Sequence, residues 1–478
     1  MLFNSLNFAL FLPIVFVLYW FVFNKSLKLQ NMLLLFASYF FYACWDWRFL
    51  FLLIFSTLLD YYTGLKMEAT SNAGKRKFWF LTSIIINIGF LGIFKYYNFF
   101  ADSFATALSQ FGLSSSPWVL NVILPVGISF YTFHGLSYVI DIYKKRIPAE
   151  KNFIDYAVFV SFFPLLVAGP IERATHLLPQ IKQKRSFNYS QAVDGLRQIL
   201  WGLFKKIVIA DQCATYADLI FGNAAEYPGS TLFAGALFFT FQIYADFSGY
   251  SDIALGTARL FGIDLLRNFA FPYFSRNMAE FWRRWHISLS SWFRDYLYIP
   301  LGGSRGNMAM KIRNVLIIFI VSGFWHGANW TFIVWGFLHA MYVIPSVIFK
   351  TNRKNLDIVA QGKILPSVRE FFAMAITFTL TAFAWIFFRS DSVGQACFMI
   401  NKIFSSAFFV FPNILPKNVI ALVAIFMIIE WMGRESKYAI QHLGFKLSRP
   451  IRWAFYYILA FAIFYYAGSK QQFIYFQF

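Results

Sequence analysis

Long apolar runs separated by short basic loops dominate the chain. The first run, residues 7–23, has no basic segment before it, and no small-residue cleavage site follows it. It is therefore predicted to be a membrane span and not a signal peptide. Later runs lie near residues 31–45, 50–65, 78–94, 119–140, 153–168, 196–210, 231–246, 315–349, 370–389, 418–432 and 453–468. Counting the long run at 315–349 twice, the pattern predicts about 11 to 13 membrane segments.

Several of these runs are shorter than the roughly 20 residues that a membrane-spanning helix needs. Short or interrupted segments occur in membrane proteins where the backbone is buried in protein or lines a cavity. The fold class predicted here is an all-α, polytopic integral membrane protein in which some helices are re-entrant or broken. No internal repeat, heptad pattern or low-complexity tract is visible, so one integral domain over residues 1–478 is the simplest arrangement.

Basic residues in the early loops predict the orientation of the chain. The loops at 24–30 and 66–77 are rich in lysine and arginine, whereas the segment before residue 7 has neither. Because cytoplasmic loops carry the excess of Lys and Arg, the N-terminus is predicted to be extracytoplasmic. The basic loop at 144–151 fits the cytoplasm after two further spans.

Composition supports a membrane protein and excludes other classes. Hydrophobic residues make up 59 % and charged residues 13 %, with a mean hydropathy of +0.56. These values exclude a water-soluble globule, a disordered chain and a nucleic-acid-binding domain. The net charge of +20 is explained by cytoplasmic loops and anionic lipid headgroups, so membrane lipids are the expected contacts. Cys44, Cys213 and Cys397 have no CxxC spacing, and neither a disulfide framework nor a metal site is predicted.

The stretch 273–313 combines positive charge with regularly spaced aromatic residues. Its aromatic and leucine side chains recur at spacings of three and four from Trp282 to Tyr296. This spacing predicts one amphipathic helix at the membrane interface, with His286 on its apolar side. A histidine there is either satisfied by a backbone carbonyl or available for chemistry. The PLGGSRG segment that follows is a flexible turn that could approach a phosphate-bearing donor.

The run at 315–349 is too long for one span, because a continuous helix would measure about 52 Å against a membrane core of about 30 Å. Gly323, Gly327 and Asn329 mark the predicted break. His326 would lie about 17 Å from a helix start at Val315, close to the middle of the membrane. An imidazole at that depth suits general acid–base chemistry, and the alternative is a structural histidine bonding across helices.

Other polar residues in apolar surroundings are interpreted individually. Asp246, Ser248, Tyr250 and Asp252 are expected at the end of a span, with a turn at Gly249. The remaining candidates are one pair of adjacent charged residues and three histidines. Glu172–Arg173 is expected to be a structural ion pair, His339 structural and His442 solvated, while His134 is left open. No nucleophile elbow, P-loop, HExxH or dinucleotide motif is present in the sequence.

Six ordered segments resemble the membrane-bound O-acyltransferase (MBOAT) family, in its branch of bacterial alginate O-acetyltransferases and D-alanyl transferases. They are FNSLNFALFLPIVFVLYW, SYVIDIYKK, GPIER, YADFSGYSDIA, FWRRWHISLSSWFRDYLYIPLGG and SGFWHGANWTFIVWG. The resemblance implies that His326 is catalytic, that His286 is the second characteristic polar residue, and that a tunnel pierces the core. It implies N-terminal helices at 1–118, a catalytic core at about 119–349 and C-terminal helices at 350–478.

The same resemblance implies further residues that bind substrate or support the tunnel, all within the matching segments. They are Trp285, Arg294, Asp295, Tyr298, Trp325, Asn329, Asp246, Tyr250, Glu172 and Arg173.

The function implied is O-acetylation of an exported, alginate-like polysaccharide at the bacterial inner membrane. The acetyl group would come from a cytoplasmic thioester such as acetyl-CoA, with no bound cofactor, and an extracytoplasmic partner protein could complete the transfer. The alternative is a transporter or flippase of a lipid-linked or acyl species, since broken helices and polar residues within the membrane also occur in transporters.

Overall fold

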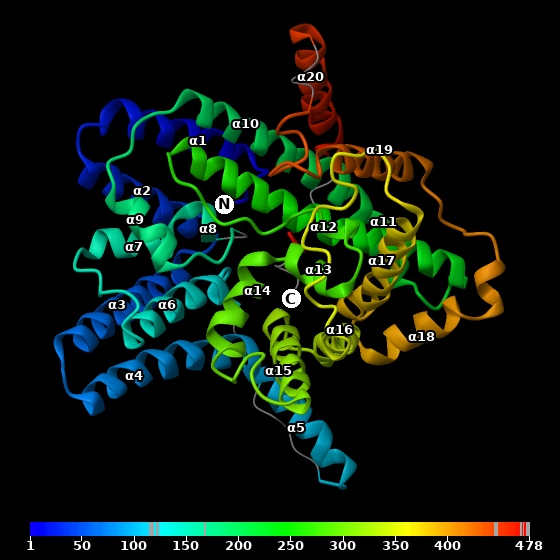
Figure 1. The fold of residues 1–478 in the computed structure, drawn as a ribbon, viewed down its shortest axis with the longest axis horizontal. Coiled ribbons are helices and arrows are strands. Elements are labelled where there is room, and N and C mark those ends of the chain that lie inside the picture. Colours follow the sequence, from blue (N-terminus) through cyan, green and yellow to red (C-terminus); the bar gives the residue numbers. More distant parts are fainter. Residues whose placement is uncertain are drawn as a thin grey trace. The chain divides into compact units, whose positions relative to one another are not determined.

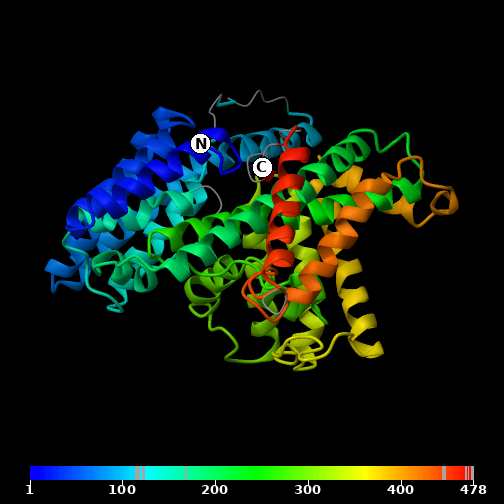
Figure 2. The same ribbon diagram turned by 90° about the horizontal axis from the view of Figure 1, so that it is seen from above.

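A computed structural model describes residues 1–113, 119–120, 124–166, 169–443, 448–468, 471 and 473–474. Helices and connecting loops form all of this part of the chain, which contains no β-strand, as both views show (Figure 1, Figure 2). The chain divides into two compact units. Met1–Tyr189 and Ala258–Leu265 form the first unit, and Ser190–Thr257 and Leu266–Phe478 form the second. The predicted all-α fold class is confirmed for the described residues.

The first unit holds the N-terminal helices. They are α1 (Leu6–Val17), η1 (Leu18–Val22), α2 (Leu27–Ala43), α3 (Trp47–Ala69), α4 (Ala73–Leu91), η2 (Gly92–Tyr96), α5 (Tyr97–Gln110), α6 (Ile128–Tyr143), α7 (Phe153–Ser161), α8 (Phe163–Leu166) and α9 (Ala174–Lys182). Helix α3 packs against α4 and α6, beside which it lies in Figure 1. The buried Asp60 carboxylate accepts hydrogen bonds from Ser83 at 2.6 Å and Asn87 at 2.8 Å, which ties α3 to α4.

The second unit contains the remaining helices. They are α10 (Tyr189–Phe204), η3 (Lys205–Ala210), α11 (Asp211–Gly222), α12 (Gly229–Leu260), η4 (Pro272–Phe274), α13 (Met278–Arg284), α14 (Ile287–Phe293), η5 (Arg294–Tyr298), α15 (Met308–His326), α16 (Trp330–Ile348), α17 (Val368–Arg389), α18 (Val393–Ile403), η6 (Ser406–Phe409), α19 (Lys417–Gly433) and α20 (Arg449–Tyr466). Tyr189 at the start of α10 and the last residues of α12 are grouped with the first unit.

Helices α15 and α16 of the second unit form a closely packed hairpin. Gly323 on α15 faces the Phe332 carbonyl, and Gly336 on α16 faces the Phe319 carbonyl, so a Cβ atom at either glycine would collide with the opposite backbone. Small residues at such crossings let two membrane helices approach to backbone contact. The hairpin confirms the break predicted between residues 323 and 329.

Five helical segments among the described residues are long and apolar enough to cross a membrane. They are Trp47–Ala69, Ala73–Gln110, Met308–His326, Trp330–Ile348 and Val368–Arg389. Two shorter apolar helical segments, Leu6–Val22 and Phe153–Leu166, fall below that length. The larger number of 11 to 13 segments, which counts short and broken runs, remains a prediction, as does the orientation of the N-terminus.

The predicted turn at Gly249 is wrong. Helix α12 runs without interruption from Gly229 to Leu260, and the polar residues near position 249 lie within it. Gly249 serves a close contact with Gly202 of α10: a Cβ atom at either glycine would lie 2.8 Å or less from the carbonyl oxygen of the other. The glycine permits close helix packing, and sequence pattern alone does not distinguish this role from a turn.

Candidate functional site

His326 is the last residue of α15. Gly327 follows it as the C-cap, and Asn329 caps α16 by accepting a hydrogen bond from the Thr331 N–H at 3.0 Å. Helix α15 begins at Met308 and not near Val315, so the distance of about 17 Å from a helix start at Val315 does not apply. The depth of His326 in the membrane stays a prediction. Only 4 % of the histidine is exposed. The end of the helix therefore presents a buried imidazole at the bend between two helices.

His286 lies at a sharp bend between α13 and α14. Its φ of +43° is in the left-handed region, which costs a non-glycine residue about 1–2 kcal/mol. The bend is held by the segment before it: the Ile287 N–H donates to the Asn268 carbonyl at 2.9 Å, and the Ala270 N–H donates to the Arg284 carbonyl at 3.0 Å. The prediction of one continuous amphipathic helix over this stretch is wrong, because these long-range backbone bonds interrupt it.

The two histidines approach each other within a layer of aromatic side chains. Their ring centroids are 6.5 Å apart, and the ring planes are inclined by 64°. The Trp325 ring lies 6.0 Å from His286 and 5.0 Å from His326, while Trp335 and Phe388 pack edge-on against His326. The two residues singled out at positions 286 and 326 are thus brought together in the folded chain.

His286 is fully buried, and within the described part of the chain no hydrogen-bond partner is placed at either of its ring nitrogens. No backbone carbonyl of a neighbouring described residue is placed at hydrogen-bond distance from the ring. A buried polar atom without a partner costs about 1–3 kcal/mol. Together with the left-handed backbone, this places two unfavourable features at one residue, a combination typical of functional positions.

A third buried histidine, His339 on α16, has a different environment. Its Nδ1 accepts a hydrogen bond from the Trp282 indole N–H at 3.3 Å, and its ring stacks on Phe281 at 6.2 Å. Trp335 separates the centres of His326 and His339, packing edge-on against both rings. This packing agrees with the structural role expected of His339. His134 is buried in the first unit, and His442 is exposed.

Trp285, immediately before His286, is 1 % exposed and acts as the packing centre of this layer. Its ring lies 5.1 Å from both Phe269 and Trp385 and 5.5 Å from Phe281. The aromatic face predicted for the membrane interface is therefore turned into the protein, where it holds the histidine bend against α17.

Asp246 and Tyr250 of α12 belong to a buried ion network that includes two lysines. The Lys206 ammonium lies 2.8 Å from Asp246 and 2.9 Å from Asp211, and above the Tyr250 ring at 5.5 Å. Lys205 lies 2.5 Å from Asp252. Sequence reasoning missed both lysines, although a Lys-Lys pair inside an apolar run is a visible signal. This network joins η3 to α12.

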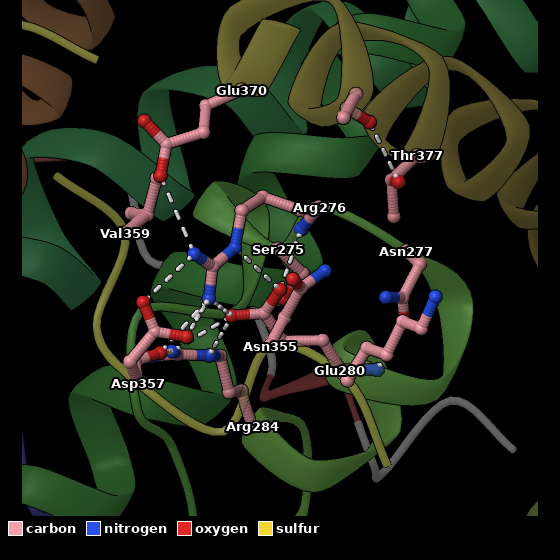
Figure 3. A network of polar contacts seen from close by, with 12 residues as sticks. Ser275, Arg276, Asn277, Glu280, Arg284, Asn355, Asp357, Val359, Glu370 and Thr377 are labelled. Atoms are coloured by element: carbon pink, nitrogen blue, oxygen red, sulfur yellow. Dashed lines mark hydrogen bonds and ion pairs between the residues drawn. The ribbon is translucent and has the colours of Figure 1, made fainter. Parts of the chain in front are cut away.

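Part of the positive charge of residues 273–313 is neutralised in a cluster shown in Figure 3, which we call the arginine network. Its members are Arg276, Glu280, Arg284, Asp357 and Glu370. The buried Glu280 carboxylate pairs with Arg276 at 3.1 Å and with Arg284 at 2.8 Å, and Arg276 also reaches Asp357 at 3.1 Å. These arginines bind the loop before α17 to α13.

Arg294, Asp295 and Tyr298 lie on the π-helical turn η5. Arg294 pairs with its neighbour Asp295 at 2.7 Å, and the Tyr298 hydroxyl lies 3.1 Å from the Ser304 hydroxyl. The turn is closed by the Gly303 N–H, which donates to the Tyr298 carbonyl at 2.8 Å. Their role beside a tunnel remains a prediction.

Glu172 and Arg173 belong to the first unit. The fully buried Glu172 carboxylate lies 2.8 Å from the His176 Nδ1, and this hydrogen bond raises the pKa of His176. Arg173 is the N-cap residue of α9. Among the described residues no group of three or more His, Cys, Asp or Glu side chains could hold a metal ion.

Comparison with known proteins identifies the family of the chain. Residues 143–383 match the MBOAT, membrane-bound O-acyltransferase family. The chain is 41 % identical to the "Probable alginate O-acetylase AlgI" of Pseudomonas syringae over 85 % of this chain and 75 % of that protein. It is 37 % identical to the "Peptidoglycan O-acetyltransferase" of Helicobacter pylori over 83 % and 78 %. The "Teichoic acid D-alanyltransferase" of Bacillus subtilis is 28 % identical over 56 % and 69 %. The chain therefore belongs to the membrane-bound O-acyltransferase family and is a multi-pass membrane acyltransferase.

Proposed function

We propose that this protein transfers an acetyl group from a thioester donor to hydroxyl groups of an exported or cell-surface polysaccharide. The histidine pair, His286 and His326, is the observation that carries the proposal, because it places two imidazoles within one buried aromatic layer. The relatives named as alginate O-acetylase and peptidoglycan O-acetyltransferase support acetyl as the group and a polysaccharide as the acceptor. Membership of an acyltransferase family disfavours the transporter alternative.

The spacing of the two rings fits one reacting centre between them. Hydrogen bonds to a ring nitrogen have lengths of about 2.9 Å, and each nitrogen lies about 1 Å from its ring centroid, so one oxygen can reach both rings across a centroid separation of 6.5 Å. His286 has both ring nitrogens without a partner among the described residues, and it can orient the acyl carbonyl or the acceptor hydroxyl. The surrounding rings exclude water, which would otherwise compete as the acceptor.

In the reaction proposed, His326 takes the proton of the acceptor hydroxyl as the oxygen attacks the thioester carbonyl carbon. The carbon–sulfur bond breaks, and the imidazolium returns the proton to the leaving thiolate. A variant of this route has the imidazole nitrogen attack first and hold the acetyl group until the hydroxyl displaces it. The two routes differ in whether thiol is released before an acceptor is added.

Acetyl-CoA is the donor proposed, and no bound cofactor is required for the chemistry described. The donor would approach from the cytoplasm, and the acetyl group would leave on the other side of the inner membrane. An extracytoplasmic partner protein could carry it to the final polysaccharide. The resemblance to alginate O-acetyltransferases supports this part of the proposal.

The test uses the purified full-length protein in lipid nanodiscs, labelled acetyl-CoA and acceptor polysaccharide, with and without an extracytoplasmic extract. His326→Gln should reduce label transfer at least about 100-fold while leaving the protein folded. His442→Gln, at an exposed histidine, is the matched control and should transfer normally. The proposal would be contradicted if His326→Gln transferred label as fast as the unsubstituted protein. It would also be contradicted if the unsubstituted protein left acetyl-CoA intact in the presence of acceptor polysaccharide, both with and without the extract.

A further inference from the structure

A basic pocket lies in the first unit, at the ends of three helices. Helices α3, α4 and α6 pack against one another and lie side by side in Figure 1. Helix α3 ends at Ala69, α4 begins at Ala73 and α6 ends at Tyr143, and a pocket of about 1000 Å³ opens between these ends. Because α3 and the segment that begins with α4 are long and apolar enough to span the membrane, the pocket belongs at a membrane surface. The fold thus brings together the two basic loops at 66–77 and 144–151, which the sequence assigns to the same side of the membrane.

Four cationic side chains line this pocket together with one carboxylate, that of Glu68. Two of the cations are held by groups of the protein. Arg76 donates to the last two carbonyls of α6, at 2.5 and 3.1 Å, and Arg146 pairs with Asp141 at 3.0 Å. These two guanidinium groups fix the loop after α6 and add positive potential to the pocket.

The other two cations, Lys144 and Lys145, are exposed, and among the described residues neither side chain has an ion-pair partner. Lys144 is the C-cap of α6, and Lys145 follows it with a φ of +58°, in the left-handed region. Glycine is the usual residue at this place after a helix, because a Cβ atom is strained there. A lysine in such a position favours a role for its side chain in binding.

Aromatic and apolar side chains continue from the pocket along α3 and α4. The Tyr62 ring packs edge-on against Trp79 at 5.6 Å, and the neighbouring Phe78 is exposed. Aromatic residues close to the end of a span are typical of the membrane interface. Farther from the pocket, Phe55 on α3 and Ile85 on α4 are also exposed. The basic pocket is therefore continuous with helices that present apolar surface.

We propose that this pocket binds the phosphate group of an anionic phospholipid, whose acyl chains lie against the exposed apolar side chains of α3 and α4. Lys144 and Lys145 supply the charges that the protein itself leaves unpaired, and the hydroxyls of Thr70 and Ser71, which also line the pocket, can donate to the phosphate. Basic pockets between membrane helices suit lipid headgroups of this kind. A soluble phosphate would meet the same cations, but it has no acyl chains for the apolar surface.

The test measures lipid binding to the full-length protein in neutral detergent by native mass spectrometry, without an acetyl donor. Phosphatidylglycerol should bind at least about tenfold more tightly than phosphatidylcholine. The double variant Lys144→Gln/Lys145→Gln should bind phosphatidylglycerol about 30-fold more weakly, because each lysine near the membrane surface contributes about fivefold. Its affinity for phosphatidylcholine should not change. The matched control is Lys25→Gln/Lys28→Gln, at two exposed lysines of the first unit that do not line the pocket, and it should change the affinity less than about twofold.

Lys145→Gly separates lipid binding from a structural role of this lysine. Glycine removes the ammonium group and adopts the left-handed backbone without strain. The Tm of the lipid-free protein should therefore stay the same or rise, while the affinity for phosphatidylglycerol should fall about fivefold. A lower Tm with unchanged affinity would overturn the role of Lys145 in binding.

Three further outcomes would overturn the lipid site. The first is equal affinity of the unsubstituted protein for phosphatidylglycerol and phosphatidylcholine. The second is an equal loss of affinity in the control pair, which would show that the lipid is attracted by the basic surface as a whole. The third is displacement of phosphatidylglycerol by inorganic phosphate at the same concentration, which would assign the pocket to a soluble anion.

Discussion

The arginine network and His286 of the histidine pair both lie in the second unit. The charged groups of the network have several partners, whereas the His286 ring has none among the described residues. In the network, Glu280 accepts hydrogen bonds from both Arg276 and Arg284, and Arg276 also reaches Asp357 and Glu370. In the pair, His286 has two ring nitrogens for which the described residues offer no partner. Each region includes residues of the short segment from Arg276 to His286, so their difference does not arise from the location of that segment along the chain.

This difference in hydrogen bonding indicates two roles: the arginine network stabilises the fold, and His286 is available for the reaction. Buried charges that are paired on several sides resist any change that removes one partner, because the other partner is left uncompensated. A buried imidazole without a protein partner gives up little stability when it is replaced, but it leaves two nitrogens free to bind a substrate. The network fixes α13 and the loop before α17, and the bend that follows α13 presents His286.

The largest effect on stability is expected at Glu280. Glu280→Ala leaves the Arg276 and Arg284 side chains, which are 7 % and 13 % exposed, without their shared carboxylate. The free energy of unfolding should fall by about 3–5 kcal/mol, measured by thermal unfolding of the detergent-solubilised protein. Glu226→Ala, at an exposed carboxylate, is the control. A stability equal to that of the unsubstituted protein would show that the network is not structural.

His286→Asn should have a large effect on activity and a smaller one on stability. Asparagine tolerates the left-handed backbone at this position, and the substitution removes the imidazole without leaving a former partner unsatisfied. Acetyl transfer per folded molecule should fall about 100-fold or more, whereas the loss of stability should stay well below that of Glu280→Ala. Equal losses of stability in the two variants would remove the contrast between the regions.

His339→Gln tests whether any histidine in the aromatic layer would behave in the same way. This residue is as buried as His286, but its Nδ1 is bonded to Trp282. Loss of that bond should lower the free energy of unfolding by about 1 kcal/mol, and acetyl transfer should change less than about threefold. A 100-fold loss of transfer would place His339 with the histidine pair, contrary to the structural role assigned to it.

Much of the fold, and the break in the chain at one of the two histidines, could be predicted from the sequence alone. The break after His326 follows from the length of one apolar run and the Gly327–Asn329 signal, both local properties. The bend at His286 could not be predicted, because it depends on backbone bonds to Asn268 and Ala270, which no periodicity reveals. The partners of Lys206 on α11 and α12 are likewise visible only after the helices have packed.

The smallest effect is expected at Asp357, the exposed end of the arginine network. Hydrogen bonds from Arg276 hold the pKa of Asp357 below its usual range, so the pair contributes stability above about pH 4 and loses it as the pH falls through the lowered folded-state pKa. Because the Asp357 side chain is 61 % exposed, Asp357→Asn should lower the free energy of unfolding by only about 0.5 kcal/mol at neutral pH. The difference from the unsubstituted protein should shrink in high salt and disappear once the pH has fallen below the lowered folded-state pKa of Asp357, as measured by thermal unfolding across a pH series. If the free energies of unfolding of the two proteins differed by the same amount at every pH, packing of the loop, and not the charge of Asp357, would link this residue to the network. Burial of the network side chains would then contribute more to stability than their ion pairs.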